Sequence, residues 1–384
     1  MNNPLVTIIT PSFNQGEYIE DTILSILQQT YSTIEYIVVD GVSTDKTHEI
    51  LKKYCDKISS VIIEPDEGQT DAINKGINIS HGSIIGYVNS DDLLENDAVE
   101  RVVSFFSNNV DVNMVYGSCH YIDDKGELLY DLIPGSYDLN RLILGNYISQ
   151  PTVFFRTELI MKIGFFDKRL HYAMDYDYWL RIAMQGKIIF IPRFLAKFRI
   201  HSNSKTTLCP LDFYEETAHI MSKLLVDSKN LPYAEFIFHS YAINIFRLFH
   251  GLSRNKCDFD LNSSNYSLLC DLFMNDYMNE IKNIFKSLKL KHYSIAKNQF
   301  LKLETDLNHQ IRIIENSGGT EFLSEGSPCF TSLFYSFCND LLGKEILFSL
   351  CLEVLMFLAH PCIYLIKFNI GRLIRKFCQC PKIG

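Results

Sequence analysis

Residues 6–40 read VTIITPSFNQGEYIEDTILSILQQTYSTIEYIVVD, in which two apolar runs flank a segment of helical periodicity. Residues 6–10 are short, β-branched and ended by Pro11, which predicts a buried strand. Within 17–29 the apolar residues recur at helical spacing, which predicts an amphipathic helix. Residues 36–39 predict the next strand, so this stretch has the order strand, helix, strand.

The same alternation continues downstream, with helices predicted at 48–54 and 71–79 and strands at 61–63 and 84–88. A repeated strand–helix order predicts an α/β fold, with a mostly parallel sheet and helices on both faces. Such sheets bind ligands beyond the carboxyl ends of their strands. Polar clusters follow three of the predicted strands, so we expect three loops to converge on one rim, at residues 10–14, 40–45 and 89–92.

Three regions of different character make up the chain. Short predicted strands at 114–116, 152–155 and 188–191 extend the first domain to 1–210. The segment 211–316 is helical in pattern and rich in Lys, Asn and aromatics, and predicts a helical extension. After a linker-like stretch comes an apolar tail at 328–384.

Composition excludes several classes of protein. With Lys+Arg 36 against Asp+Glu 45, the net charge of -9 argues against a nucleic-acid partner. Hydrophobic residues make up 47% and charged residues 21%, which excludes wholesale disorder. The 11 cysteines are scattered without a CxxC pair, so we expect a cytoplasmic protein rather than a disulfide-stapled secreted one.

Asn89-Ser90-Asp91-Asp92 places two adjacent carboxylates at the predicted rim. Successive side chains of an extended segment point to opposite sides, so Asp91 and Asp92 are expected to have different roles. One carboxylate together with substrate phosphates is a usual way of holding Mg²⁺. The alternative is structural: Asp92 as the N-cap of a helix beginning at Leu93.

Asp40 also ends a predicted strand. Its carboxylate can accept a hydrogen bond from a nucleobase N–H, or it can belong to a turn before a helix whose first turn contains Asp45, and the two roles are compatible. Asp175 opens a predicted helix whose Trp179, four residues on, should anchor the same face in the core. A carboxylate beside aromatics tends towards a raised pKa, which suits a general base. From the spacing alone, however, a helix cap with a Tyr-Trp core anchor is the favoured interpretation.

Six motifs, taken in order, resemble family 2 inverting glycosyltransferases of the GT-A fold, in the bacterial group that builds cell-surface polysaccharides. They are VTIITPSFNQGEY, IEYIVVDGVSTDKT, GQTDAINKG, GYVNSDD, QPTVFFR and MDYDYWLR. The resemblance covers about residues 4–205 and implies that 1–210 is a GT-A catalytic domain.

The resemblance implies roles for particular residues. Asp175 matches the catalytic base, and Asp91 the ligand of Mg²⁺ or Mn²⁺. His201 matches a histidine that approaches the metal or the diphosphate. The positions that match the nucleotide-binding pocket are Thr10, Pro11, Asn14, Asp40, Asp71, Asn74, Asn89 and Ser90. Three residues depart from the family pattern: Asn89 replaces the first Asp of DXD, Met174 replaces a Glu, and Ile73 replaces an Arg.

The implied function is transfer of a sugar, with inversion, from a nucleotide-diphospho-sugar to a hydroxyl of a glycan or lipid-linked acceptor. A UDP-sugar is the expected donor. A non-catalytic nucleotide-sugar-binding scaffold is the alternative, but retention of Asp91 and Asp175 favours the enzyme. A nucleotidyltransferase would need a Gly-rich basic loop after the first strand, which PSFNQGEY is not.

The mean hydropathy of +0.02 conceals an apolar stretch within the tail. Residues 346–366 have the length of a membrane span, but Glu353 and His360 argue against one. We predict an interfacial helix and a location at the inner face of the cell membrane. The alternatives are a buried helix or a contact in a homo-oligomer.

Overall fold

The computed structural model describes residues 3–205 and 210–226, with isolated positions 233, 237, 240, 241, 244, 298 and 302. The chain divides into two compact units, Met1–Asn255 and Lys256–Gly384, and the elements below belong to the first. Of the predicted helical extension at 211–316, the structure describes residues 211–226 and the isolated positions given above. The apolar tail at 328–384, with its predicted membrane contact, lies outside the described residues.

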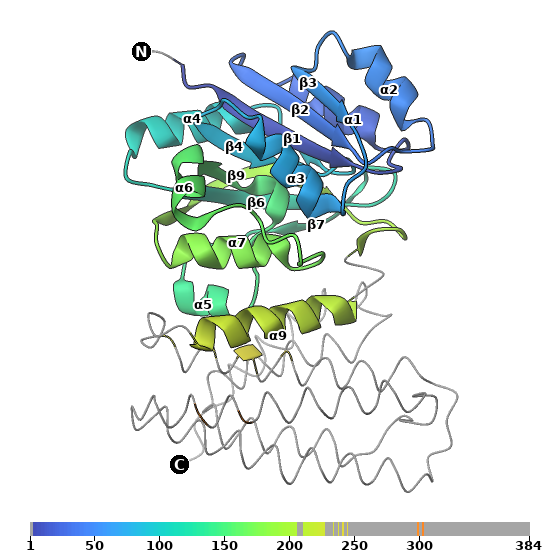
Figure 1. The fold of residues 1–384 in the computed structure, drawn as a ribbon. Helices are drawn as coiled ribbons and strands as arrows, with labels where there is room; N and C mark the ends of the chain where they lie inside the picture. Colours follow the sequence, from blue (N-terminus) through green and yellow to red (C-terminus); the bar gives the residue numbers. More distant parts are fainter. Residues whose placement is uncertain are drawn as a thin grey trace, which may run out of the picture. The chain divides into compact units, whose positions relative to one another are not determined.

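Four parallel strands form one half of the sheet, in the order β3-β2-β1-β4 (Figure 1). They alternate along the chain with three helices, as predicted. The elements are β1 (Val6–Ser12), α1 (Ile19–Leu27), β2 (Ile34–Asp40), α2 (Thr47–Tyr54), β3 (Ser60–Ile63), α3 (Gln69–Asn78) and β4 (Ile84–Tyr87).

The first strand runs two residues beyond its predicted end. Pro11 pairs in register with Val39, and β1 continues to Ser12. Strand β4 pairs with β1 only as far as Ile9. Beyond that point β1 has one neighbour, so the missing N–H of Pro11 is tolerated.

The other half of the sheet is mixed. The full order is β3-β2-β1-β4-β8-β6-β9-β5, with β7 beside β6. Only β6 and β9 are parallel here; the pairs β4–β8, β8–β6, β9–β5 and β6–β7 are antiparallel. These strands are β5 (Leu93–Leu94), β6 (Met114–Ile122), β7 (Leu128–Leu132), β8 (Phe154–Arg156) and β9 (Ile188–Arg199). The α/β class is confirmed, with the predicted parallel arrangement strongest in the first half.

Strand β9 is much longer than the predicted 188–191, because Pro192 does not end it. The register between β6 and β9 shifts between Tyr116 and Ser118, around Gly117. A Cβ on Gly117 would lie 2.5 Å from Leu195 and 2.8 Å from the Arg193 carbonyl, so the backbones approach closely here. Such an irregularity lets a strand accommodate proline, and it extends β9 to Arg199 at the rim.

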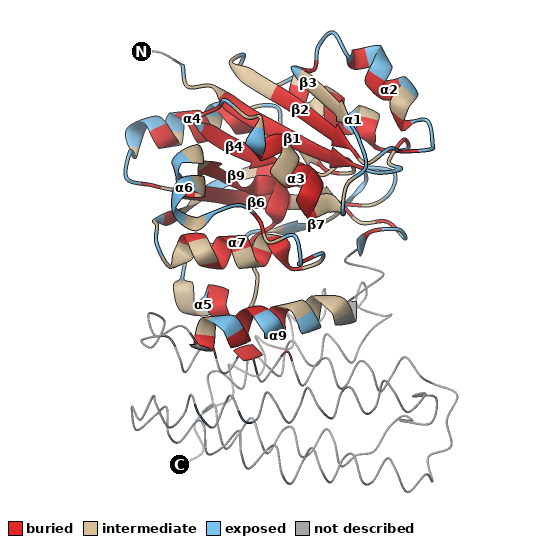
Figure 2. Cartoon of the chain, in the orientation of Figure 1, coloured by how far each residue is buried: buried red, intermediate tan, exposed pale blue. Residues whose placement is uncertain are grey.

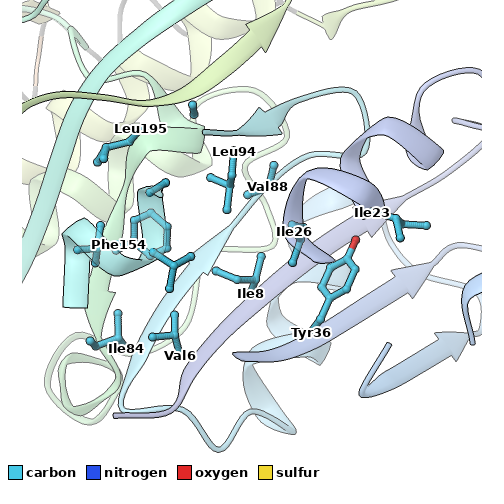
Figure 3. Close-up of a cluster of buried hydrophobic side chains, with 14 of the residues drawn as sticks. Val6, Ile8, Ile23, Ile26, Tyr36, Ile84, Val88, Leu94, Phe154 and Leu195 are labelled. Atoms are coloured by element: carbon cyan, nitrogen blue, oxygen red, sulfur yellow. The ribbon is translucent and has the colours of Figure 1, made fainter. Parts of the chain in front are cut away.

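Helices α1, α2 and α4 (Ala98–Asn108) pack on one face of the sheet around Ile8, Val38 and Phe154. Figure 3 shows part of this cluster, in which Ile23 and Ile26 of α1 lie beside Ile8 of β1 and Tyr36 of β2. Helix α3 packs on the opposite face, so closely that a Cβ on Gly76 would lie 2.6 Å from Ile9. Figure 2 shows buried strands with exposed residues on the outer helices. The predicted helices on both faces are therefore present.

Among its described residues, the second half of this unit contains the helices α5 (Leu139–Leu144), α6 (Ile160–Ile163), α7 (Met174–Ala183) and α9 (Pro210–Val226). Helix α9 contacts α7 (Figure 1). Trp179 of α7 is fully buried, which confirms the predicted core anchor. Within the described part of the chain, no helix combines the length and apolar character needed to cross a membrane.

Candidate functional site

A cavity of about 540 Å³ opens at the carboxyl ends of the parallel strands. Its wall includes Pro11 after β1, Gly41 after β2, and residues 89–92 after β4. The predicted convergence of three loops is thus confirmed. Further lining comes from Gln150, from residues 171, 172, 174 and 175, and from residues 203–205.

The Asn89–Asp92 loop separates its two carboxylates as expected. Asp91 lines the cavity with its side chain 18% exposed, whereas Asp92 is 1% exposed. Burial, and then the neighbouring charge of Asp91, raises the pKa of Asp92 well above its usual value. Leu93 begins strand β5 and not a helix, so the N-cap alternative for Asp92 is wrong.

Asp91 and His201 are brought together across the cavity rim. Nε2 of His201 lies 2.9 Å from Oδ2 of Asp91. The backbone N–H of Asn203 donates to Nδ1 at 3.3 Å, so in the neutral ring the proton sits on Nε2 and is donated to Asp91. This tautomer favours Asp91 as the metal ligand and His201 as its hydrogen-bond donor. Direct ligation by His201 stays a prediction, one that needs the other tautomer.

Arg199, which sequence reasoning did not single out, holds this loop in place. Its side chain is 3% exposed, and its Nε donates to the Asp91 carbonyl at 2.9 Å. Its backbone N–H donates to Oδ1 of Asp92 at 2.9 Å. Arg199 is the last residue of β9 and lies two residues before His201, so the end of β9 holds the Asn89–Asp92 loop and also positions His201 beside Asp91. The only signal in the sequence was the arginine of FRIHSNSKT.

Asp175 lies on the cavity wall in the first turn of α7. Oδ1 accepts a hydrogen bond from the backbone N–H of Tyr176 at 2.7 Å, and Oδ2 accepts one from Asn146 at 3.4 Å. Burial raises the pKa of Asp175 to about 6. A carboxylate of this pKa is ionised at neutral pH and remains a useful proton acceptor.

Glu216 of α9 clamps the segment that leads into Asp175. Its carboxylate accepts hydrogen bonds from three successive backbone N–H groups, those of His171 (2.7 Å), Tyr172 (2.8 Å) and Ala173 (2.7 Å). These N–H groups precede α7, where a negative charge is favourable. Sequence reasoning missed Glu216 because nothing local connects residue 216 with residues 171–173.

Glu216→Gln is expected to lower kcat by about tenfold through loss of Asp175 alignment, with the KM for the donor little changed. The charge of Glu216 contributes to the raised pKa of Asp175, so the acid limb of kcat/KM should also move to lower pH. The measurement is a steady-state pH profile with Glu215→Gln as control, since Glu215 is an exposed carboxylate on the same helix. Identical behaviour of the two variants would remove the positioning role.

The predicted nucleotide-binding residues lie at different depths. Pro11, Asn89 and Ser90 line the cavity. Asp40 is fully buried and does not line it, because its carboxylate accepts from the Ser43 N–H (2.8 Å) and hydroxyl (2.6 Å) and lies 2.8 Å from Nε2 of His48. The turn alternative for Asp40 is therefore present in the structure, and base recognition stays a prediction.

Thr10 and Asn14 shape the first loop behind the cavity wall. The Thr10 hydroxyl accepts from the Tyr36 hydroxyl at 3.2 Å. Asn14 has φ 52°, and its Oδ1 accepts from the Thr44 N–H at 2.8 Å. These contacts tie the loop after β1 to the loop after β2.

Asp71 and Asn74 of α3 make structural contacts. Asp71 pairs with Lys168 at 3.0 Å and Lys75 at 3.4 Å, and these partners lower its pKa although burial opposes them. Asn74 donates to the Phe166 carbonyl at 2.9 Å and accepts from its N–H at 3.1 Å. Neither side chain lines the cavity, so their predicted nucleotide contacts remain predictions.

Comparisons with known proteins bear on this arrangement. The model of the family described as glycosyl transferase family 2 matches residues 7–157. An uncharacterized glycosyltransferase of Rickettsia typhi is 34% identical over 232 residues, which cover 58% of this chain and 72% of the relative. The chain belongs to glycosyltransferase family 2. A second relative, an uncharacterized glycosyltransferase of Methanocaldococcus jannaschii, is 29% identical over 210 residues, or 52% of this chain and 72% of the relative.

Solved structures agree with the family assignment at the level of the fold. Staphylococcus aureus TarS 1–349 in complex with UDP-GlcNAc has a TM-score of 0.57 at 18% identity, covering 80% of this chain and 92% of that one. At this identity the likeness shows the fold alone, which is the predicted GT-A type. The family model ends at residue 157, so it includes Asp91 but not Asp175, His201 or Glu216.

Proposed function

We propose that the cavity transfers a sugar, with inversion, from a nucleotide-diphospho-sugar to a hydroxyl of a glycan or lipid-linked acceptor. The observation that carries this proposal is the placement of Asp91 and Asp175 on the wall of one cavity at the strand ends. Asp91 follows β4 in the DXD position, and Asp175 begins α7 with a pKa raised to about 6 by burial. One carboxylate is thus available for the diphosphate side and the other for the acceptor proton.

In the proposed reaction, the Asp175 carboxylate removes the proton from the acceptor hydroxyl. The oxygen attacks the anomeric carbon from the side opposite the diphosphate, forming the glycosidic bond as the bond to the diphosphate breaks. The hydrogen bond from Tyr176 holds Oδ1, which leaves Oδ2, with its longer contact to Asn146, as the better proton acceptor. A single displacement of this kind inverts the configuration.

A divalent cation, Mg²⁺ or Mn²⁺, is implied by the family. Among the described residues no group of three or more His, Cys, Asp and Glu side chains is placed to hold a metal ion. The chain still fits a cation bound through substrate, because one carboxylate with phosphate oxygens is a common Mg²⁺ site and Asp91 is partly exposed. When bound, the cation would offset charge on the leaving diphosphate.

Neutralisation of the diphosphate needs a second source, because Ile73 replaces the usual Arg. Of the described residues that line the cavity, Lys205 alone is a lysine or arginine. Its Nζ donates to the His171 carbonyl at 3.2 Å and lies over the Tyr172 ring. It therefore ties the 171–173 segment to the cavity while carrying a positive charge.

A UDP-sugar is the donor we propose first, supported by the UDP-GlcNAc complex of TarS. The test is nucleoside diphosphate release from a panel of UDP-, GDP- and dTDP-sugars with Mg²⁺ or Mn²⁺. Metal-dependent turnover of one nucleotide class would support the enzyme. Tight binding without turnover would favour the scaffold alternative, and no binding at all would overturn both.

The predicted location at the inner membrane face rests on the apolar tail at 328–384, which lies outside the described part of the chain. Flotation with liposomes, before and after deletion from Ser327, tests the predicted membrane contact. Equal recovery would overturn it.

A further inference from the structure

Three residues of the cavity wall, Ser12, Tyr87 and Gln150, have a buried side-chain atom with no hydrogen-bond partner among the described residues. Two of them, Tyr87 and Gln150, pair a hydroxyl donor with an amide oxygen acceptor. Tyr87 is 2% exposed and Gln150 is 7% exposed. The Tyr87 hydroxyl and Oε1 of Gln150 are both fully buried atoms without a hydrogen bond. Buried polar groups are nearly always satisfied, so this pair needs a partner.

The two side chains are held in position by other contacts. Nε2 of Gln150 donates to the Tyr87 backbone carbonyl at 2.7 Å, which fixes the amide and leaves Oε1 as the open acceptor. The Tyr87 ring packs edge-on against Phe166, with centroids 5.7 Å apart. Both residues are thus oriented without using the Tyr87 hydroxyl or Oε1.

Tyr87 and Gln150 line the same cavity as Asp91 and Asp175. Tyr87 ends β4, immediately before the loop that carries Asp91. Gln150 lies four residues after Asn146, which bonds Asp175. Burial, and then the charges of Asp175 and Asp92, raises the pKa of Tyr87 well above its usual value, so its hydroxyl stays protonated and can donate.

A phenol that donates and an amide oxygen that accepts select a ligand group that does both. A phosphate or carboxylate oxygen only accepts, so Oε1 of Gln150 would repel it. An alcohol can meet both requirements, because its oxygen accepts from the phenol and its proton is donated to the amide oxygen. We propose that Tyr87 and Gln150 together bind one hydroxyl of the donor's transferred sugar, an assignment that rests on the proposed function.

The donor sugar is favoured over the acceptor because of continuity along the chain. The loop that follows Tyr87 holds the diphosphate side of the cavity through Asp91, and the transferred sugar is covalently attached to that diphosphate. A site built to hydrogen-bond a substrate hydroxyl discriminates strongly against ligands that lack it. Tyr87 and Gln150 are then specificity-determining residues for the sugar.

The test compares binding of UDP with binding of UDP-glucose, UDP-galactose and UDP-N-acetylglucosamine by calorimetry in the presence of Mn²⁺. Tyr87→Phe removes only the hydroxyl and should weaken the preferred UDP-sugar by about 5–10-fold, with UDP itself unchanged. Gln150→Leu should act in the same direction. The affinity of the double variant for the UDP-sugar should be close to that of the single variant with the lower affinity, since both side chains bind the same hydroxyl.

Tyr116→Phe is the matched control, because Tyr116 is a buried tyrosine outside the cavity whose hydroxyl already donates to the Gly135 carbonyl. It should leave both affinities unchanged. Equal affinities of wild type and Tyr87→Phe for the preferred UDP-sugar would overturn the inference, as would an equal loss for UDP and UDP-sugar. Failure of wild type to bind any UDP-sugar would instead count against the proposed function.

Discussion

Asp175→Asn is expected to lose about 10²–10⁴-fold in sugar transfer while unfolding at a higher temperature than wild type at pH 7.5. Transfer is lost because an amide cannot take the acceptor proton. Donor binding should persist, since Asn retains the size of the side chain and an oxygen to accept from the Tyr176 N–H. Turnover and calorimetry on the same preparation separate the two effects.

The gain in stability follows from the raised pKa. Burial lifts the pKa of Asp175 from 3.8 to about 6, so the folded protein holds this proton more tightly than the unfolded chain. Stability therefore falls as pH rises between these values, and the full penalty applies above pH 6. The upper bound is about 3 kcal/mol, and the open cavity reduces it to roughly 1–2 kcal/mol. Asn removes this penalty at pH 7.5 but gains nothing below pH 4.

Asp177→Asn is the matched control, two residues away on the same helix. Asp177 bonds Arg181 at 2.8 Å and does not line the cavity. Its transfer rate should stay within a few-fold of wild type. Near-wild-type transfer by Asp175→Asn, or an equal loss in both variants, would contradict the role of Asp175 as the base.

Asp91→Asn is expected to abolish the enhancement of nucleotide binding by metal. In wild type, Mn²⁺ should tighten UDP binding by at least about tenfold, because the cation links the carboxylate to the diphosphate. Asn keeps the shape of the side chain but loses the charge that holds the cation. Calorimetry with UDP, with and without Mn²⁺, measures the effect.

His201→Asn completes this test, because His201 contacts Asp91 through Nε2. If the histidine only orients the carboxylate, the variant should keep a weakened dependence on metal. Complete loss would make His201 a ligand in its own right. Unchanged metal enhancement in Asp91→Asn would contradict the assignment of Asp91.

The parallel half of the fold could be predicted because its signals are local. Buried β-branched runs alternate with helical periodicity, and the polar loops at the strand ends identify the cavity rim. The second half was harder. Strand β9 passes through Pro192 because of the irregularity at Gly117, and neither the bulge nor the antiparallel return of β8 leaves a periodic signal.

The candidate site divides in the same way. Asp91 and Asp175 stood out because each carboxylate sits at the end or start of a predicted element. Arg199, Glu216, Tyr87 and Gln150 did not, because their importance arises from contacts between segments distant in sequence. For Asp40 the position at the end of β2 could be predicted from the sequence, but its hydrogen-bond partners could not. Its carboxylate accepts from the Ser43 N–H and contacts His48, and both contacts lie within the turn and helix that follow.

Val42 shows a local conflict that only the structure reveals. It adopts φ 64° in the turn after β2, a conformation that a β-branched residue rarely takes. The sequence DGVSTD predicted a turn but not which residue would be left-handed. The strained valine follows Gly41 of the cavity wall, so the turn is maintained at some cost in stability.

The pH dependence of kcat/KM for wild type tests the central claim most directly. If ionised Asp175 is the general base of this cavity, kcat/KM should be level near neutral pH and fall about tenfold per unit below pH 6. Circular dichroism at each pH shows that the protein stays folded. A kcat/KM that remains level down to pH 4.5 would contradict the account.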